Sequence, residues 1–210
     1  MINKTGQFIV LDGPDGCGKS TQTRLLAEWI TGQGWEVVSY RDPGTTAIGE
    51  KIREILLDPS HTAMTDTVEV LLYMAARAQL WAEHIGPDLE HGRFVVMDRW
   101  LSSTCAYQGY AGGVGVQKVL AVAEAALERV WPDVTIILDV DVETARQRMN
   151  RDLDRMEQKG ADYHTRVREG FLAMQKHCPN AAVIDARASV ERVHQGVCEY
   201  LKAVLGWQNV

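Results

Sequence analysis

A phosphate-binding loop is the strongest chemical signal in the sequence. The stretch Gly13-Pro-Asp-Gly-Cys-Gly-Lys19-Ser20 fits the pattern G-x-x-x-x-G-K-S/T, and it follows an apolar run at residues 8–11. The glycines let successive backbone N–H groups turn toward a polyphosphate, and the helix that follows directs its positive dipole end to the same place. Lys19 would neutralise phosphate oxygens, and Ser20 would offer its hydroxyl to Mg²⁺. The candidate ligands of a nucleoside triphosphate are therefore Gly13, Pro14, Asp15, Gly16, Cys17, Gly18, Lys19, Ser20 and Thr21.

Asp98 and Arg99 are a second pair of residues whose types suit a role in chemistry. They follow directly after the apolar run 94–97. A carboxylate at the end of a strand opposite a phosphate loop is placed to hold Mg²⁺ directly or through water. Arginine next to it binds phosphate well, because its planar fork offers paired donors. We expect Ser20 and Asp98 to position the metal and Arg99 to bind a phosphate.

Tyr73 and Arg77 stand four residues apart in a helical pattern, and hence on one face of a helix. An aromatic plane beside five N–H donors suits a nucleobase and its exocyclic oxygens. Such a pair on its own is more often structural. Arg53, on the polar side of the preceding predicted helix, is able to reach back toward a cleft, although a solvated arginine fits the pattern equally well.

The segment 146–168 is dense in charge, with arginines at 146, 148, 151, 155, 166 and 168. Taken alone, this composition favours a solvated helix pair laced by ion pairs between successive turns. Beside a phosphate loop it favours a lid, over about residues 146–162, that brings an arginine to a transferring phosphoryl group. The candidates for that catalytic role are Arg148, Arg151 and Arg155.

The elements that must position these residues alternate between strand-like and helical patterns. Apolar runs occur at residues 8–11, 37–40, 94–97, 135–140 and 182–184, and they are nearly continuous, as in strands covered on both faces. The pattern predicts one domain over residues 1–210, a doubly wound three-layer α/β/α sandwich with a five-stranded parallel sheet and a short helical lid. Ligands of such sheets bind beyond the carboxyl ends of the strands, where the candidate residues lie.

Composition narrows the classes of partner and compartment. The net charge of −6 argues against general binding to nucleic acid or to anionic membranes. The N-terminal stretch is polar, and no apolar run approaches the roughly 20 residues of a membrane span, so we expect a cytoplasmic protein. The four cysteines lack C-x-x-C spacing, which favours free thiols, and the six histidines show no ligand pattern for a metal site made by protein alone.

Taken in order, the motifs resemble those of the bacterial thymidylate kinases over nearly the whole chain. The matching stretches are residues 13–21, Arg41-Asp-Pro-Gly44, Leu72-Tyr-Met-Ala-Ala-Arg77, Asp98-Arg99, Ser103-Thr104, Ala106-Tyr-Gln-Gly109, Pro132-Asp-Val-Thr135, Leu138-Asp-Val140, Asp154-Arg-Met-Glu157 and Ile184-Asp-Ala186. The resemblance implies a phosphate-loop kinase fold and the conversion of dTMP to dTDP with ATP and Mg²⁺, in a cytoplasmic homodimer.

The resemblance also implies roles for single residues on the acceptor side. Asp15 would bind the 3′-hydroxyl of dTMP, Arg99 and Arg53 its 5′-phosphate, and Tyr73 would stack on the base. The thymine edge would be read by Arg77, Thr104 and Gln108. Tyr107 would crowd a ribose 2′-hydroxyl, and the loop residues Asp42 and Pro43 would complete the acceptor site. Because residue 16 is glycine rather than the arginine found in one branch of the family, the lid would supply the catalytic arginine.

Several positions depart from the common family pattern, among them Thr45, Asp42, Trp100, Ser102 and Val114. These changes leave the phosphate machinery whole and bear on acceptor selectivity. One alternative is therefore a kinase for another deoxynucleotide or a nucleoside. Another is a phosphate-loop ATPase that acts as a switch and hydrolyses ATP without any acceptor.

Overall fold

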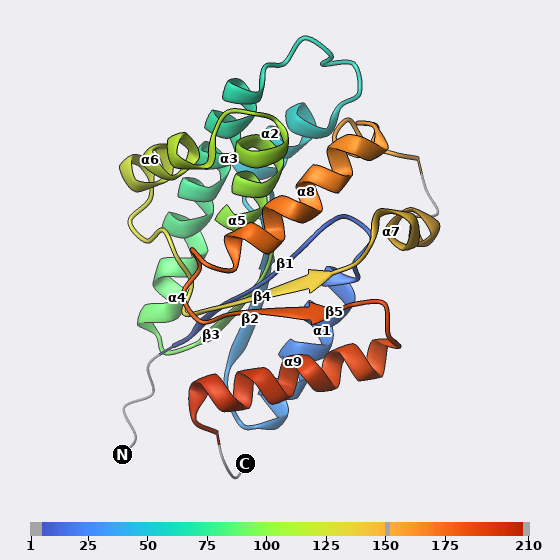
Figure 1. Ribbon diagram of the computed structural model, residues 1–210. Helices are drawn as coiled ribbons and strands as arrows, with labels where there is room; N and C mark the ends of the chain where they lie inside the picture. The colour runs from blue at the N-terminus through green and yellow to red at the C-terminus, as the bar shows by residue number, and fades with distance from the viewer. Residues whose placement is uncertain (1–5, 150–151, 208–210) are drawn as a thin grey trace.

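A parallel sheet runs through the middle of the molecule (Figure 1), in a computed structural model that describes residues 6–149 and 152–207. Its strand order is β2-β3-β1-β4-β5. The strands are β1 Phe8–Asp12, β2 Val37–Arg41, β3 Phe94–Asp98, β4 Val134–Asp139 and β5 Ala181–Asp185. The predicted five-stranded parallel sheet is confirmed, with strand ends that differ from the predicted ones by at most one residue.

The register of the sheet brings the functional strand ends together. Leu11 of β1 pairs with Asp98 of β3, Arg41 of β2 pairs with the same Asp98, and Asp12 pairs with Ile137 of β4. The carboxyl ends of these strands consequently meet at one edge of the sheet. That edge is where a doubly wound sheet binds its ligand.

Helices cover both faces of the sheet, which explains why β1 is wholly buried and why its apolar run is continuous. The helices are α1 Lys19–Gly32, α2 Ala47–Leu57, α3 Asp66–Leu80, α4 Gly86–Glu90, α5 Leu101–Thr104, α6 Val116–Ala126, α7 Val142–Arg148, α8 Ala161–Met174 and α9 Val190–Leu205. Wider π-helical turns at Trp81–Ile85 and Cys105–Ala111 follow α3 and α5 directly. No helix of the described residues has the length and apolarity that crossing a membrane requires.

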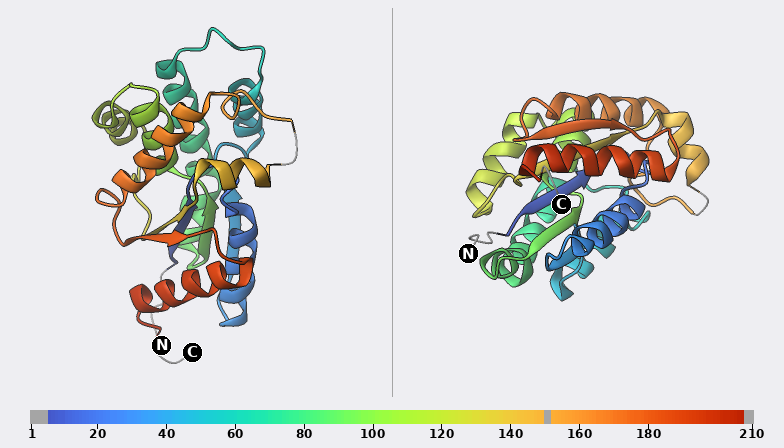
Figure 2. Two further views of the ribbon diagram at one scale, coloured as in Figure 1. Left: turned by 45° about the vertical axis from the view of Figure 1, so that its right-hand side comes forward. Right: turned by 90° about the horizontal axis from the view of Figure 1, so that it is seen from below.

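Three apolar clusters lie among the described residues, and two of them pack helices against the two faces of the sheet. On one face, Leu26 of α1 and Val197 of α9 pack against Leu11 of β1. On the other face, Val10 of β1 lies in a core to which Met74 of α3 contributes, together with residues of α5, α6 and α8. Figure 1 shows α1 and α9 on one side of the sheet and the remaining large helices on the other, and Figure 2 shows the same division from two further directions.

The segment predicted as a helical lid differs from the expectation. The range 146–162 takes in the end of α7 and the start of α8, but residues 152–160 between them form no helix and include a turn at residues 155–158. Asp154 accepts hydrogen bonds at Oδ1 from the backbone N–H groups of Met156 (2.9 Å) and Glu157 (3.0 Å). Such local bonds compete with helical ones, which accounts for the turn. Arg151 lies outside the described residues, as do residues 1–5 of the polar N-terminal stretch.

Candidate active site

The loop between β1 and α1 has the geometry of an anion site. Gly18, the residue before α1, has φ +93°, and the helix begins with neither a capping side chain nor an acidic residue in its first turn. Its first N–H groups are thus left for an external acceptor, and the helix dipole favours an anion there. Gly16 has φ +75°, and a Cβ atom on it would lie 2.4 Å from the carbonyl oxygen of Ala145 in α7. A side chain at residue 16 would require the loop or the α7 backbone to shift, so the loop as packed here has no room for an arginine at this position.

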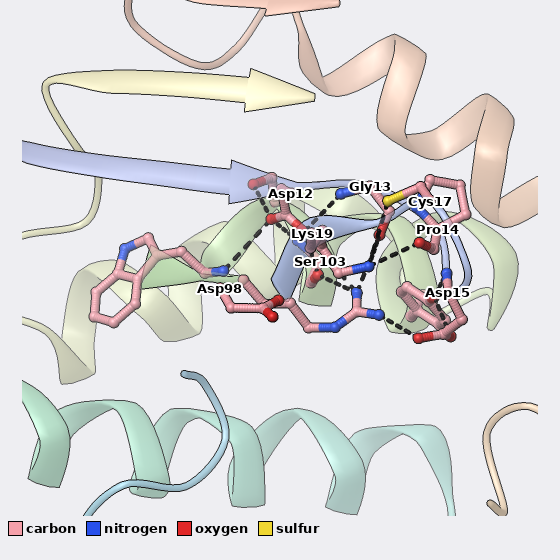
Figure 3. A network of polar contacts seen from close by, with 12 residues as sticks. Asp12, Gly13, Pro14, Asp15, Cys17, Lys19, Asp98 and Ser103 are labelled. Atoms are coloured by element: carbon pink, nitrogen blue, oxygen red, sulfur yellow. Dashed lines mark hydrogen bonds and ion pairs between the residues drawn. The ribbon is translucent and has the colours of Figure 1, made fainter. Parts of the chain in front are cut away.

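Lys19 folds back over the loop that precedes it (Figure 3). Its Nζ donates to the carbonyl oxygens of Gly13 (3.0 Å) and Pro14 (2.7 Å), and the side chain is buried. The ammonium group is therefore held at the centre of the loop, where phosphate oxygens would compete for its hydrogens. Cys17 lies 3.5 Å from the same Nζ, and burial raises the pKa of its thiol in spite of the lysine charge.

Ser20 and Asp98, predicted as the metal pair, are in direct contact. The Ser20 hydroxyl donates to Asp98 Oδ2 across 2.6 Å, and the two residues come from α1 and β3. A hydroxyl and a carboxylate are hard oxygen ligands of the kind that Mg²⁺ prefers, with phosphates completing the shell. No group of three or more His, Cys, Asp or Glu residues among those described is able to hold a metal ion by itself. The residues present thus fit Mg²⁺ that arrives with a polyphosphate.

Asp12, which the sequence analysis did not single out, is the polar centre of the site (Figure 3). The carboxylate has no exposed surface. Its Oδ1 accepts from the N–H of Gly13 (3.0 Å) and the hydroxyl of Ser103 (2.5 Å). Its Oδ2 accepts from the hydroxyl of Ser102 (2.5 Å) and from the N–H groups of Ser103 (3.0 Å) and Trp100 (3.4 Å). Asp12 therefore ties the start of the phosphate loop to the chain after β3.

Arg99 projects from that chain over the phosphate loop. Its backbone has φ +74°, unusual for a residue with a side chain, and its N–H donates to the carbonyl of Leu11. Nη1 donates to Gly13 O (3.2 Å) and Ser103 Oγ (2.9 Å), and Nη2 pairs with the carboxylate of Asp15. Burial would lower the pKa of Arg99, but the nearby acidic groups raise it well above its ordinary value. The group therefore keeps its positive charge in the cleft.

Asp15 lies at the boundary between the phosphate loop and the chain after α5. The Tyr107 hydroxyl donates to its Oδ2 across 2.6 Å, and the Asp15 N–H donates back to the Tyr107 oxygen across 3.2 Å. Burial would raise the pKa of Asp15, but Arg99, Lys19 and the Tyr107 hydrogen bond outweigh it and lower the pKa to about 2. Asp15 is consequently an ionised acceptor at any physiological pH.

A cleft of about 830 Å³ opens beside the phosphate loop. Lys19, Arg99 and Arg148 line it, and its far wall is formed by the residues that lead from β5 into α9. Arg148 comes from the end of α7 and donates to the carbonyl oxygen of Ala186 across 2.9 Å. The cleft thus combines a basic floor with a wall from the fifth strand, which suits the polyphosphate and the nucleoside of a triphosphate.

A second pocket, of about 90 Å³, adjoins this cleft. All ten predicted acceptor residues line it: Asp15, Asp42, Pro43, Arg53, Tyr73, Arg77, Arg99, Thr104, Tyr107 and Gln108. The sequence analysis did not assign the other lining residues, which are Leu57, Ser103, Asp154, Met156 and Glu157. Three of these belong to the Asp154-Arg-Met-Glu157 motif, and that motif was the feature of the sequence from which their place in the pocket could have been predicted.

Arg77 and Asp42 form a buried ion pair in the wall of this pocket. Arg77 Nε donates to Asp42 Oδ2 across 2.8 Å, Nη2 bonds to the same oxygen, and both side chains are 1% exposed. Nη2 also donates to Thr104 Oγ1 (3.1 Å), and the guanidinium lies 5.1 Å from the ring centre of Trp100. Asp42 thus acts in the pocket mainly through Arg77, whose position it fixes.

Two of the three candidates for the catalytic arginine, Arg148 and Arg155, lie within the described residues and have different surroundings. Arg148 lines the cleft beside Lys19, as noted above. Arg155, in contrast, donates from Nη1 to Glu69 (2.6 Å) and from Nε to the carbonyl of Leu56 (2.8 Å). Those contacts place Arg155 against α2 and α3, on the side of the second pocket.

Comparisons with known proteins agree on one family. Residues 11–197 match the thymidylate kinase family. The chain is 42% identical over 202 residues to a thymidylate kinase of Thermoanaerobacter sp. (strain X514), covering 95% of this chain and 99% of that protein. It is 36% identical over 206 residues to that of Clostridium novyi (strain NT), covering 96% and 100%. A crystal structure of thymidylate kinase from Ehrlichia chaffeensis superposes with a TM-score of 0.77 at 29% identity, over 94% of this chain and 99% of that one.

Proposed function

Since the chain belongs to the thymidylate kinase family, we propose that its site transfers the γ-phosphoryl group of ATP to the 5′-phosphate of dTMP, with dTDP and ADP as products. The observation that carries this proposal is the meeting of the two pockets. Arg99 and Asp15 line both the large cleft and the smaller pocket. A donor in one and an acceptor in the other would therefore approach each other across Arg99.

The phosphate loop would bind ATP, the phosphate donor. The uncapped N-terminus of α1 and the ammonium group of Lys19 would hold the β- and γ-phosphates. Ser20 and Asp98 would hold Mg²⁺, which when bound supplies positive charge to the donor phosphates. Arg148 is the described lid arginine best placed to approach the donor, because it lines the same cleft as Lys19.

Phosphoryl transfer to a monophosphate needs charge neutralisation more than a general base. The attacking oxygen is already anionic, so the main task is to bring two anions together in line. Arg99 is suited to this task because it is charged, held by Ser103 and Asp15, and common to both pockets. An arginine that neutralises a transferring phosphoryl group is worth about 10³ to 10⁵ in rate.

The acceptor's base and sugar would bind in the smaller pocket. Tyr73 would stack on thymine, while Arg77, Thr104 and Gln108 would contact its polar edge. Asp15 would accept a hydrogen bond from the 3′-hydroxyl. This built acceptor pocket disfavours an ATPase switch, which would have no use for it.

We propose that the protein is a homodimer in the cytoplasm, as its resemblance to the family implies. Apolar side chains are exposed on the neighbouring helices α2 (Ile48, Ile55) and α3 (Val68, Leu71), and they would be covered in a homodimer. The cytoplasm is the proposed compartment, in keeping with four free cysteines. Sedimentation velocity of the protein and of Leu71→Asp tests the first proposal, since a monomeric parent protein would contradict it.

The test of function measures ADP formation from Mg·ATP with dTMP, dUMP, dGMP, dCMP, UMP and thymidine offered separately. We expect strong turnover of dTMP, weaker turnover of dUMP and little with the others, because the thymine methyl contributes only about 1–3 kcal/mol of discrimination. Lys19→Ala and Arg99→Ala should almost abolish turnover, while Lys176→Ala, a change at an exposed lysine, should not. Hydrolysis that is indifferent to every acceptor would contradict the proposal.

A further inference from the structure

Glu69 is a buried carboxylate of α3 whose two oxygens hold different partners. Its Oε2 accepts from the side-chain amide Nε2 of Gln108 across 2.8 Å, and its Oε1 accepts from Nη1 of Arg155 across 2.6 Å. The ammonium of Lys159 lies 3.6 Å from the same Oε1. The residue is only 1% exposed, and neither the triphosphate cleft nor the acceptor pocket includes it in its lining.

This arrangement decides which way the Gln108 amide points. A carboxylate paired with cations only accepts hydrogen bonds, and Glu69 has both Arg155 and Lys159 beside its Oε1. The amide nitrogen of Gln108 must therefore face Glu69, and its carbonyl oxygen is the group left over. Within the described chain no hydrogen bond reaches that oxygen, although Gln108 lines the acceptor pocket.

The pocket accordingly shows the acceptor a fixed pattern of polar groups. Arg77 has donors only, and its position is set by Asp42. Gln108 contributes an acceptor, its carbonyl oxygen. A base with a carbonyl next to a ring N–H, as in thymine and uracil, complements a donor beside an acceptor. Cytosine carries an amino group next to an unprotonated ring nitrogen, so it would oppose donor to donor and acceptor to acceptor.

We propose that Glu69 is a positioning residue that sets the polarity of base recognition, by holding Gln108 with its carbonyl oxygen toward the acceptor. The proposal rests on the function proposed above and names the residue that decides between an imide base and an amino base. Glu69 does not touch the acceptor itself. It acts through Gln108, while Arg155 from the 152–160 segment pairs with the other oxygen of Glu69.

The variant Glu69→Gln makes a sharp test because it keeps the shape of the side chain. Its amide oxygen would still accept from Arg155, which has only donors to offer, so its NH₂ group would face Gln108. Gln108 would then turn over, offer its carbonyl to residue 69 and present its own NH₂ to the pocket. The pocket would then show the base two donors, Arg77 and the turned amide. These oppose the ring N–H of thymine and suit the ring nitrogen of cytosine, although Arg77 still faces the cytosine amino group.

The experiment measures the binding of dTMP and dCMP by calorimetry in the absence of ATP, and kcat/KM for both with Mg·ATP. In Glu69→Gln we expect the ratio of dTMP to dCMP affinity to fall by about 10- to 100-fold, with little change in KM for ATP. The matched control is Glu54→Gln, the same chemical change at an exposed residue of α2, which should keep the parent ratio. A folded Glu69→Gln protein with an unchanged ratio would overturn the proposal.

Gln108→Met, alone and combined with Glu69→Gln, provides a second test. Loss of the amide should lower the same ratio, and adding Glu69→Gln to Gln108→Met should not lower it further, because Glu69 would have nothing left to orient. Effects on the ratio that add in the double variant would contradict the proposal. The calorimetric binding measurement distinguishes failure of the Glu69 proposal from failure of the kinase proposal. Parent protein that binds dTMP selectively but does not phosphorylate it would refute only the kinase function.

Discussion

Asp12→Asn is the substitution that most directly tests how the active-site turn is held. The change preserves the size of the side chain and replaces one carboxylate oxygen by NH₂. In the parent structure the two oxygens accept five hydrogen bonds from four residues: Gly13, Trp100, Ser102 and Ser103. An amide that keeps its oxygen toward the three donors at Oδ2 must turn its NH₂ toward the Gly13 N–H and the Ser103 hydroxyl.

The loss of stability in Asp12→Asn depends on whether each hydrogen-bond donor finds a new partner. The Ser103 hydroxyl can rotate and accept from the new NH₂ group, but the Gly13 N–H has no such freedom and faces another donor. A buried donor without a partner costs about 1–3 kcal/mol, and the bonds that remain go to a neutral rather than a charged oxygen. We therefore expect the free energy of unfolding to fall by about 2–4 kcal/mol.

Function should suffer more than stability alone would explain. Ser103 also accepts from Arg99, whose positive φ the anchored turn must maintain. A displacement of about 1 Å at a positioning group is able to cost on the order of 10²-fold in rate. We expect kcat/KM for dTMP to fall by about 10- to 100-fold, with a smaller effect on KM for ATP.

The assays are urea unfolding followed by tryptophan fluorescence and steady-state kinetics with dTMP varied. Asp162→Asn is the control, because Asp162 is exposed in the first turn of α8 and should cost less than about 1 kcal/mol. A loss of stability below about 0.5 kcal/mol in Asp12→Asn, with parent kinetics, would refute the reasoning, since it would mean that the five hydrogen bonds are replaceable.

Three further predictions follow from the site. Ser20→Ala should raise the Mg²⁺ concentration needed for half-maximal rate while leaving dTMP binding by calorimetry unchanged, and an unchanged Mg²⁺ requirement would argue against Ser20 as a ligand. Asp42→Ala should destabilise the fold by about 3–5 kcal/mol in urea unfolding, because it leaves the Arg77 charge buried without its partner. Asp15 has a folded-state pKa of about 2, below its ordinary value of 3.8, so its charge contributes stability above pH 4 that is lost as pH falls toward 2. The stability difference between the parent and Asp15→Asn should hence be constant from pH 5 to 7 and shrink below pH 4; a difference that grows on acidification would contradict this assignment.

Much of the fold and of the candidate site was predictable because the signals are local. The phosphate loop is contiguous in sequence, and its function depends on backbone groups that the glycines and the following helix arrange by themselves. The five strands carry nearly continuous apolar runs, and such runs are typical of a sheet that is covered by helices on both faces. The residues of the acceptor pocket were reached through the family resemblance, since Tyr73 and Arg77 taken alone were more typical of an ordinary helix surface.

Other features escaped prediction because their partners lie far apart in the chain. Asp12 is unremarkable as the last residue of a strand until the turn after β3 brings Ser103 to it. The 152–160 segment has the composition of a charged helix, yet the bonds of the Asp154 carboxylate to nearby N–H groups favour turns.

The sequence by itself determined the chemical groups of the proposed site: a glycine-rich loop of the phosphate-binding pattern, a hydroxyl and a carboxylate suited to Mg²⁺, and a supply of arginines. Only the tertiary structure decided how those groups divide the work. It placed Arg99 between the two pockets, Arg148 in the lining of the large cleft and Arg155 against Glu69. The physical reason is that a side chain's charge is a property of its residue type, whereas its partner, and hence its role, depends on which segments the packed layers bring together.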